Sequence, residues 1–283
     1  MKIIVGKTSG FCNGVKYTVE EANKMVENNK EIYCLGEIVH NERVIKDLEK
    51  KGMKTIHSIE EANRNSKLII RAHGELKETY EKAKEKEIEL LDLTCGKIKA
   101  IRLKIQNKLK DHYIVIIGKK NHPETQGVQS FSGNHSFIIE KEEDIKEWQK
   151  DFQASKKDKV YVVSQTTFNS DKFDELVNKI KETFSKVLVV DKTICDATSN
   201  RQEETRELSK KVDIMLIVGG KKSSNTKELE VISKENCKNV YLIQDVDDLK
   251  EIRIEKNSTI GIMAGASTPK VVVEEIMKHL EEL

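Results

Sequence analysis

The 283-residue chain has very little proline: only Pro123 and Pro269, where an average content of about 5% would give roughly fourteen. It also has no excess of charge of one sign, because 50 Lys and Arg residues balance 48 Asp and Glu residues to a formal net charge of +2. A strongly basic chain would indicate a nucleic acid or an anionic membrane surface as partner. The near-neutral balance disfavours both, so we expect no nucleic-acid and no membrane partner.

Long hydrophobic runs are absent as well. The densest apolar runs, residues 113–117 and 214–218, have the length of a strand and fall short of the ~18 to 20 residues that span a bilayer. The first residues, MKIIVGKTSGFC, lack the apolar core of a signal peptide, so we expect a cytoplasmic protein. The five cysteines are an odd number, and without an export signal they indicate reduced thiols or metal ligands in place of disulfides.

Three stretches of the chain repeat one pattern: a strand end, a cysteine, an amphipathic helix, a buried strand and a polar loop. The three cysteines are Cys12, Cys95 and Cys195, and the polar loop follows each after 28, 27 and 29 residues. These loops lie at His40, His122 and Ser224, and a second strand and loop follow in each copy at His73, Thr166 and Ser267. Coincidence across three copies is improbable, so the pattern indicates an internal repeat.

Strands that alternate with helices of ten to fifteen residues indicate βαβ units with parallel sheets, in which ligands bind beyond the carboxyl ends of the strands. We therefore predict an α/β protein of three small domains of about 95 residues, related by a pseudo-threefold axis, with their strand-end loops converging on one centre. The predicted domains are residues 1–95, 96–193 and 194–283. The N-terminal strand is a candidate to pair with the third domain.

One cysteine in each repeat could meet the other two at the axis, and three thiolates suit a soft metal centre. Cys34 and Cys237 lie outside the repeat and are interpreted as small buried hydrophobic residues. Two centres fit Cys12, Cys95 and Cys195. Zinc with one open position would serve hydrolysis. A cubane iron–sulfur cluster with only three cysteines would leave one iron open to substrate. The chain has no CxxC clamp to decide between them.

The strand-end loops are rich in neutral hydrogen-bond donors and contain three histidines. Such groups at strand-to-helix turns form an anion pocket that suits a small phosphorylated or diphosphorylated substrate. The candidate residues are His40, His73, His122, Thr166, Ser223, Ser224, Asn225 and Ser267. Helix capping is an alternative role for the serines, and the two roles are compatible. Neither GxxxxGK[ST] nor GxGxxG occurs, so these motifs do not support nucleotide binding.

Glu124 is the only carboxylate among these loops. A single acid beside an open metal position suits proton delivery to a leaving hydroxyl. The alternative is a first-turn glutamate that the helix dipole favours.

At this point the motifs resemble a known family, the 4-hydroxy-3-methylbut-2-enyl diphosphate reductases, over essentially the whole chain. The matching motifs are GFCNGV (10–15), GEIVHN (36–41), RAHG (71–74), TC (94–95), NHPET (121–125), SQTT (164–167), TICDATSNRQ (193–202), VGGKKSSNT (218–226) and AGASTP (264–269). The resemblance implies three α/β domains around one [4Fe-4S] cluster in which one iron has no cysteine ligand. The three cluster cysteines of the family correspond to Cys12, Cys95 and Cys195.

The resemblance also implies a reductive dehydroxylation of an allylic diphosphate to isopentenyl and dimethylallyl diphosphate, with electrons from reduced ferredoxin or flavodoxin. It assigns diphosphate binding to His40, His73, Ser223, Ser224, Asn225 and Ser267, with His122 nearby. It places Thr166 and Glu124 at the hydroxyl end of the substrate, with Glu124 in the proton relay.

The chain departs from the family around one cysteine, because Gly96 replaces the usual proline after Cys95 and Leu93 replaces the usual alanine before Thr-Cys. This loop is expected to be more flexible, which affects the lifetime of a cluster in air. Two alternatives stand beside the reductase. One is another three-cysteine cluster enzyme of the quinolinate synthase kind, which dehydrates without net reduction. The other is a zinc-containing sensor of a phosphate ligand without catalysis.

Overall fold

The computed structural model describes residues 1–28 and 31–282, so residue 283, the outer bound of the third predicted domain, lies outside them. Within these residues, twelve strands form three four-stranded sheets, and every strand pairing is parallel. Helices alternate with the strands along the chain. The predicted α/β class with parallel sheets is therefore confirmed.

The chain forms two compact units. The first comprises Met1–Glu20, Val39–Lys50 and Asp196–Leu283, and the second comprises Glu21–Ile38 and Lys51–Cys195. The boundaries of three domains at residues 95 and 193 stay a prediction.

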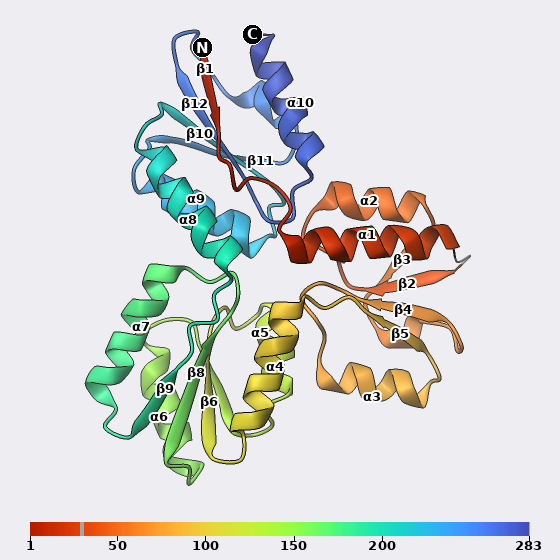
Figure 1. Cartoon of the computed structure of the whole chain (residues 1–283), viewed down its shortest axis with the longest axis vertical. Coiled ribbons are helices and arrows are strands. Elements are labelled where there is room, and N and C mark those ends of the chain that lie inside the picture. Colours follow the sequence, from red (N-terminus) through yellow and green to blue (C-terminus); the bar gives the residue numbers. More distant parts are fainter. Residues whose placement is uncertain (29–30, 283) are drawn as a thin grey trace. The chain divides into compact units, whose positions relative to one another are not determined.

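One sheet, in the order β1-β12-β10-β11, belongs to the first unit. Its strands are β1 (Lys2–Val5), β10 (Ile214–Val218), β11 (Asn239–Ile243) and β12 (Thr259–Ala264). The first strand of the chain pairs with β12, the last strand, so both ends of the chain belong to this unit (Figure 1). The helices of the unit are the first part of α1 (Asn13–Asn28), α2 (Glu42–Lys50), α8 (Asp196–Ser209), α9 (Ser224–Lys234) and α10 (Lys270–Glu281), with a 3-10 turn, η2 (Asp247–Glu251).

The second unit contains the other two sheets, in the orders β3-β2-β4-β5 and β7-β6-β8-β9. Their strands are β2 (Ile32–Leu35), β3 (Met53–Ile56), β4 (Lys67–Ile70), β5 (Glu89–Asp92), β6 (His112–Ile117), β7 (Ser136–Ile139), β8 (Lys159–Ser164) and β9 (Val187–Val190). The helices are α3 (Lys77–Glu85), α4 (Gly96–Lys108), α5 (Pro123–Ser130), α6 (Asp144–Ala154) and α7 (Ser170–Thr183), with a 3-10 turn, η1 (Ile59–Glu61).

The central strands are apolar along their whole length because helices cover both faces of a parallel sheet. All six residues of β6 and all five of β10 are buried. Trp148, the only tryptophan of the chain, is fully buried in the core of the second unit, where it packs against Phe152 and Phe184. Each such large apolar side chain contributes about 1.5 to 3 kcal/mol to folding. Among the described residues, no helix combines the length and the hydrophobicity needed to cross a membrane.

Several helices begin at strand-end loops whose residues supply their own caps. The hydroxyl of Ser223 accepts a hydrogen bond from the Thr226 N–H and caps α9. His122 caps α5 in the same way, and Pro123 takes the first helical position, where its missing N–H is no loss. Pro269 precedes the first residue of α10. Both prolines of the chain therefore fix the start of a helix at a candidate loop.

Candidate active site

Cys12, Cys95 and Cys195 each lie at the turn that leads into a helix, and each is half-buried. Cys12 belongs to the first unit, where its N–H donates to Ala266 O (3.1 Å) and its Sγ accepts from the Val15 N–H (3.5 Å). Cys95 and Cys195 belong to the second unit. A helix N-terminus favours a negatively charged ligand such as a thiolate. The three sulfur atoms therefore have the chemistry of ligands for a soft metal centre.

The other two cysteines are buried and lack this chemistry. Burial raises the pKa of the Cys34 thiol to about 12, which keeps it protonated. The Cys237 thiol lies within 3.5 to 3.8 Å of three backbone carbonyl oxygens, to which it can donate. The five cysteines, all within the described residues, form no disulfide.

Ser224 and Asn225, at the start of α9 in the first unit, have polar atoms that lack partners. Ser224 is 5% exposed and Asn225 is 3% exposed. Neither the Ser224 hydroxyl nor the side-chain oxygen and nitrogen of Asn225 makes a hydrogen bond with the described residues. A buried polar group without a partner costs about 1 to 3 kcal/mol. Such groups at a helix N-terminus are suited to receive an anion.

Three loops of the first unit meet at the backbone of His40. The Ser267 hydroxyl donates to His40 O (3.2 Å). Gly220, in the loop before α9, approaches the same carbonyl so closely that an added Cβ would lie 2.2 Å from the oxygen. The first unit therefore brings together the predicted residues His40, Ser223, Ser224, Asn225 and Ser267 with Cys12.

Glu124 belongs to the second unit and is only 1% exposed. Its Oε1 accepts from the Thr166 N–H (2.6 Å), and its Oε2 accepts from the Thr166 hydroxyl (2.8 Å). Desolvation raises the pKa of the Glu124 carboxyl to about 7, although both Thr166 bonds and the charge of Arg102 oppose the shift. A carboxyl that exchanges its proton near neutral pH suits a general acid.

The same Thr166 links Glu124 to a cysteine, because Thr166 O accepts a hydrogen bond from the Cys195 N–H (3.0 Å). In the second unit the backbone therefore joins the predicted proton donor to one predicted metal ligand. The carbonyl of Ala72, next to His73, accepts from the Cys95 N–H (3.0 Å) in the same manner.

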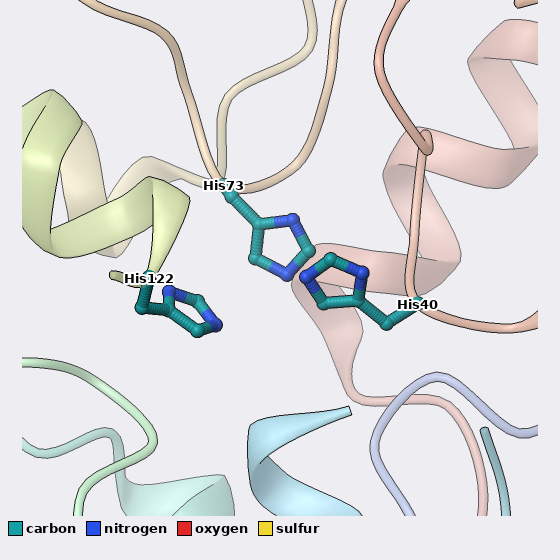
Figure 2. Close-up of side chains that lie close together, drawn as sticks. All are labelled: His40, His73 and His122. Carbon is teal, nitrogen blue, oxygen red and sulfur yellow. The ribbon is translucent and has the colours of Figure 1, made fainter. Parts of the chain in front are cut away.

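His73 and His122, also of the second unit, have their ring centroids 5.4 Å apart in an edge-to-face arrangement (Figure 2). His122 Nδ1 accepts from the Glu124 N–H (3.1 Å), which leaves Nε2 as the nitrogen that carries the proton. His122 therefore presents a donor, as the binding of an anion requires.

Two buried arginines were not among the residues selected from the sequence. Arg201 donates to Thr8 O and Gly10 O (both 2.9 Å) and so holds the loop that leads to Cys12. Arg102 donates to Glu75 O (3.0 Å) and acts electrostatically on Glu124. The sequence offers one indication of Arg102, since it interrupts an apolar stripe on its helix that Ile98, Ile101 and Ile105 share.

The comparisons with known proteins cover nearly the whole chain. Residues 3–281 match the family model described as LytB protein. The 4-hydroxy-3-methylbut-2-enyl diphosphate reductase of Thermoanaerobacter sp. (strain X514) is 38% identical over 100% of this chain and 98% of its own length. The protein of the same name from Clostridioides difficile (strain 630) is 36% identical over the full length of both chains.

Two solved structures of proteins with the same activity in their names are also similar to this chain. The E-1-hydroxy-2-methyl-but-2-enyl-4-diphosphate reductase from Plasmodium falciparum is similar with a TM-score of 0.89 and 31% identity, over 100% of this chain and 87% of that one. A second solved structure is an (E)-4-hydroxy-3-methyl-but-2-enyl diphosphate reductase described as the terminal enzyme of the non-mevalonate pathway. It is similar with a TM-score of 0.71 and 34% identity, over 100% of this chain and 99% of that one. Together with the family model and the full-length relatives, these structures show that the chain belongs to the LytB protein family.

Proposed function

We propose that the chain is a 4-hydroxy-3-methylbut-2-enyl diphosphate reductase. The reaction replaces the allylic hydroxyl of the substrate by hydrogen: two electrons and two protons enter, a C–O bond breaks, a C–H bond forms and water leaves. The products are isopentenyl and dimethylallyl diphosphate. The observation that carries the proposal is the contact of the buried Glu124 carboxyl with Thr166, the residue whose carbonyl accepts from the Cys195 N–H. Desolvation raises the pKa of this carboxyl to about 7, which suits proton transfer at neutral pH.

The reaction needs a source of electrons at the site, and we assign Cys12, Cys95 and Cys195 as ligands of one [4Fe-4S] cluster. Their half-buried sulfur atoms at helix N-termini support this, in contrast to Cys34, whose thiol is fully buried in a strand. When bound, such a cluster supplies electrons and, at an iron without a cysteine ligand, a Lewis acid. Reduced ferredoxin or flavodoxin is the proposed electron donor.

The proposed donors for the diphosphate are hydroxyl, amide and imidazole groups of the strand-end loops. In the first unit, Ser224 and Asn225 offer polar atoms that lack protein partners. The Ser223 hydroxyl accepts from Thr226 N–H and keeps its own proton to donate. His40, Ser267, His73 and His122 complete the proposed set. Because these groups bind without reacting, they hold the allylic end of the substrate in a fixed place.

The proton path follows from the contacts of Thr166. When Glu124 is ionised, the Thr166 hydroxyl donates to it. When Glu124 is protonated, the same 2.8 Å contact allows the carboxyl to donate to Thr166 Oγ1, which turns the hydroxyl proton outward. Glu124 and Thr166 thus form a two-member relay that can pass a proton toward the leaving hydroxyl.

The test is turnover under anaerobic conditions with dithionite, methyl viologen and the allylic diphosphate. We expect the two five-carbon diphosphates as products. Glu124→Gln should retain the cluster and lower turnover by about a hundred-fold, the scale of losing a positioned proton donor. A fully clustered wild-type chain that forms neither product would refute the proposed function.

A further inference from the structure

Helix α4, which begins directly after Cys95, carries charged side chains of only one sign. Its thirteen residues, GKIKAIRLKIQNK, contain five basic side chains and no acidic one, although the whole chain is nearly neutral. Asp92 and Asp191 lie close to Lys99 (3.2 Å) and Lys104 (2.8 Å) and offset part of this charge. An excess of positive charge remains on a helix whose first residue follows a proposed cluster ligand.

The exposed face of α4 also carries an apolar side chain. Leu103 is 59% exposed, the highest value among the large hydrophobic side chains of the described residues. A single exposed leucine is ordinary on a protein surface. Here it lines a groove of about 540 Å³ between α3 and α4, together with the aromatic rings of Tyr80 and Phe131. The groove therefore has an apolar centre.

Charges surround this centre. The groove is lined by four cations, Lys77, Lys84, Lys99 and Arg102, and by two carboxylates, Glu81 and Asp92. Arg102 is buried and lies over the Phe131 ring, with 4.6 Å from the guanidinium carbon to the ring centroid. Lys77 pairs with Glu81 (3.6 Å) and Lys99 pairs with Asp92 (3.2 Å), so the lining keeps a net positive charge from Lys84 and Arg102. An apolar centre with this net positive charge fits a protein surface of opposite charge.

The groove lies close to a proposed cluster ligand. Asp92 is three residues before Cys95, and the Lys99 N–H donates to Cys95 O (3.1 Å) within the first turn of α4. At 1.5 Å of rise per residue, Leu103 is about 12 Å from Cys95 along the helix axis. A partner seated on the groove would thus have a short path to that sulfur.

We propose that the groove between α3 and α4 is the docking surface for a small acidic protein that carries one electron at a time. This inference rests on the proposed function, because the reductase needs two electrons per turnover. Two molecules of the reduced carrier each lose one electron, and the pair enters the C–O to C–H exchange with two protons. Weak, charge-guided contacts of small area are typical of such electron-transfer encounters.

The test compares two electron sources. Reduced flavodoxin, an acidic protein, needs a docking surface, whereas dithionite-reduced methyl viologen is a small molecule that does not. The variants Leu103→Glu and Lys84→Glu place a negative charge in the groove at exposed positions. Val231→Glu, at a 52% exposed position on α9, introduces the same charge outside the groove and serves as the control.

We expect both groove variants to lower kcat/KM for flavodoxin by about ten-fold or more, with methyl viologen turnover and the control unchanged. Raising the ionic strength from about 0.05 to 0.5 M should weaken the flavodoxin reaction of the wild type more than that of Lys84→Glu. Unchanged flavodoxin kinetics in both groove variants, or an equal loss with methyl viologen, would overturn the proposal.

A binding measurement separates this proposal from the proposed function. Calorimetric titration of the clustered chain with oxidised flavodoxin requires no turnover, and Leu103→Glu should lose binding that Val231→Glu keeps. A wild type that binds flavodoxin in this way but makes no product with methyl viologen would refute the reductase and leave the docking surface standing. Self-association of the chain that Leu103→Glu abolishes would assign the groove to a second copy and overturn the proposal.

Discussion

The buried carboxyl of Glu124 makes the stability of the second unit depend on pH, and Glu124→Gln isolates this effect. The pKa of the group is about 7 in the folded chain, against 4.5 as its ordinary value. Because the folded-state pKa is raised, the contribution is fully present below about pH 4.5 and is lost as the pH rises through 7. Glutamine cannot ionise, so the variant should lack this loss.

The size of the effect follows from the shift. A change from 4.5 to about 7, at about 1.4 kcal/mol per pH unit, corresponds to about 3 kcal/mol. The glutamine can keep both contacts with Thr166. Its side-chain oxygen accepts from the Thr166 N–H, and its NH₂ group donates to Thr166 Oγ1 once the hydroxyl proton has turned away. We therefore expect the free energy of unfolding of the variant to exceed that of the wild type by about 3 kcal/mol more at pH 8.5 than at pH 4.5.

Urea unfolding of the iron-free chain, followed by tryptophan fluorescence, measures this difference. Trp148 is the only tryptophan and is buried in the second unit, as Glu124 is, so its signal reports on the relevant part of the chain. Glu175→Gln, at an exposed position on α7 of the same unit, is the matched control and should not change the pH dependence. Parallel pH curves for wild type and Glu124→Gln would contradict this expectation, since they would mean that folding does not raise the pKa of Glu124.

Three further predictions concern single residues. Arg102→Gln removes a cation that lowers the pKa of Glu124, so the alkaline limb of the pH–rate profile should move to higher pH; a limb that stays in place would exclude this electrostatic role. Asn225→Ala should raise KM for the allylic diphosphate about ten-fold with iron content unchanged, because it removes two buried polar atoms that lack protein partners; steady-state kinetics with iron analysis measures both quantities. Cys195→Ser should lose iron and labile sulfide, whereas Cys237→Ala should keep both, and zinc in place of iron in the wild type would end the cluster assignment.

Much of the fold could be predicted because each repeat contains local sequence signals that mark where its strands and helices begin and end. A cysteine before an amphipathic helix and a polar loop after a buried strand mark the carboxyl ends of parallel strands, and β6 and β10 form where the sequence has its densest apolar runs. The first strand was a candidate to pair with the third predicted domain, and β1 does pair with β12, which lies in residues 194–283. The exact partner could not be predicted, because a four-residue strand gives no local indication of which strand it joins more than 250 residues away.

The division of the chain into two units could not be predicted from the repeat pattern either. The chain passes from the first unit to the second after Glu20, returns at Val39 and leaves again after Lys50, so the contacts that define each unit are not local. Arg102 and Arg201 were overlooked for a related reason. Each holds backbone carbonyls of distant loops, and the sequence around a lone arginine on a helix does not reveal these partners.

The most direct test of the central claim is a count of electrons per product. The anaerobic, iron-loaded chain is mixed with a known amount of reduced methyl viologen and an excess of the allylic diphosphate, and viologen oxidation is compared with the five-carbon diphosphates formed. We expect two viologen radicals to be oxidised for each product molecule, and no product from Cys195→Ser. Conversion of the substrate without oxidation of viologen, as in a simple dehydration, would contradict it.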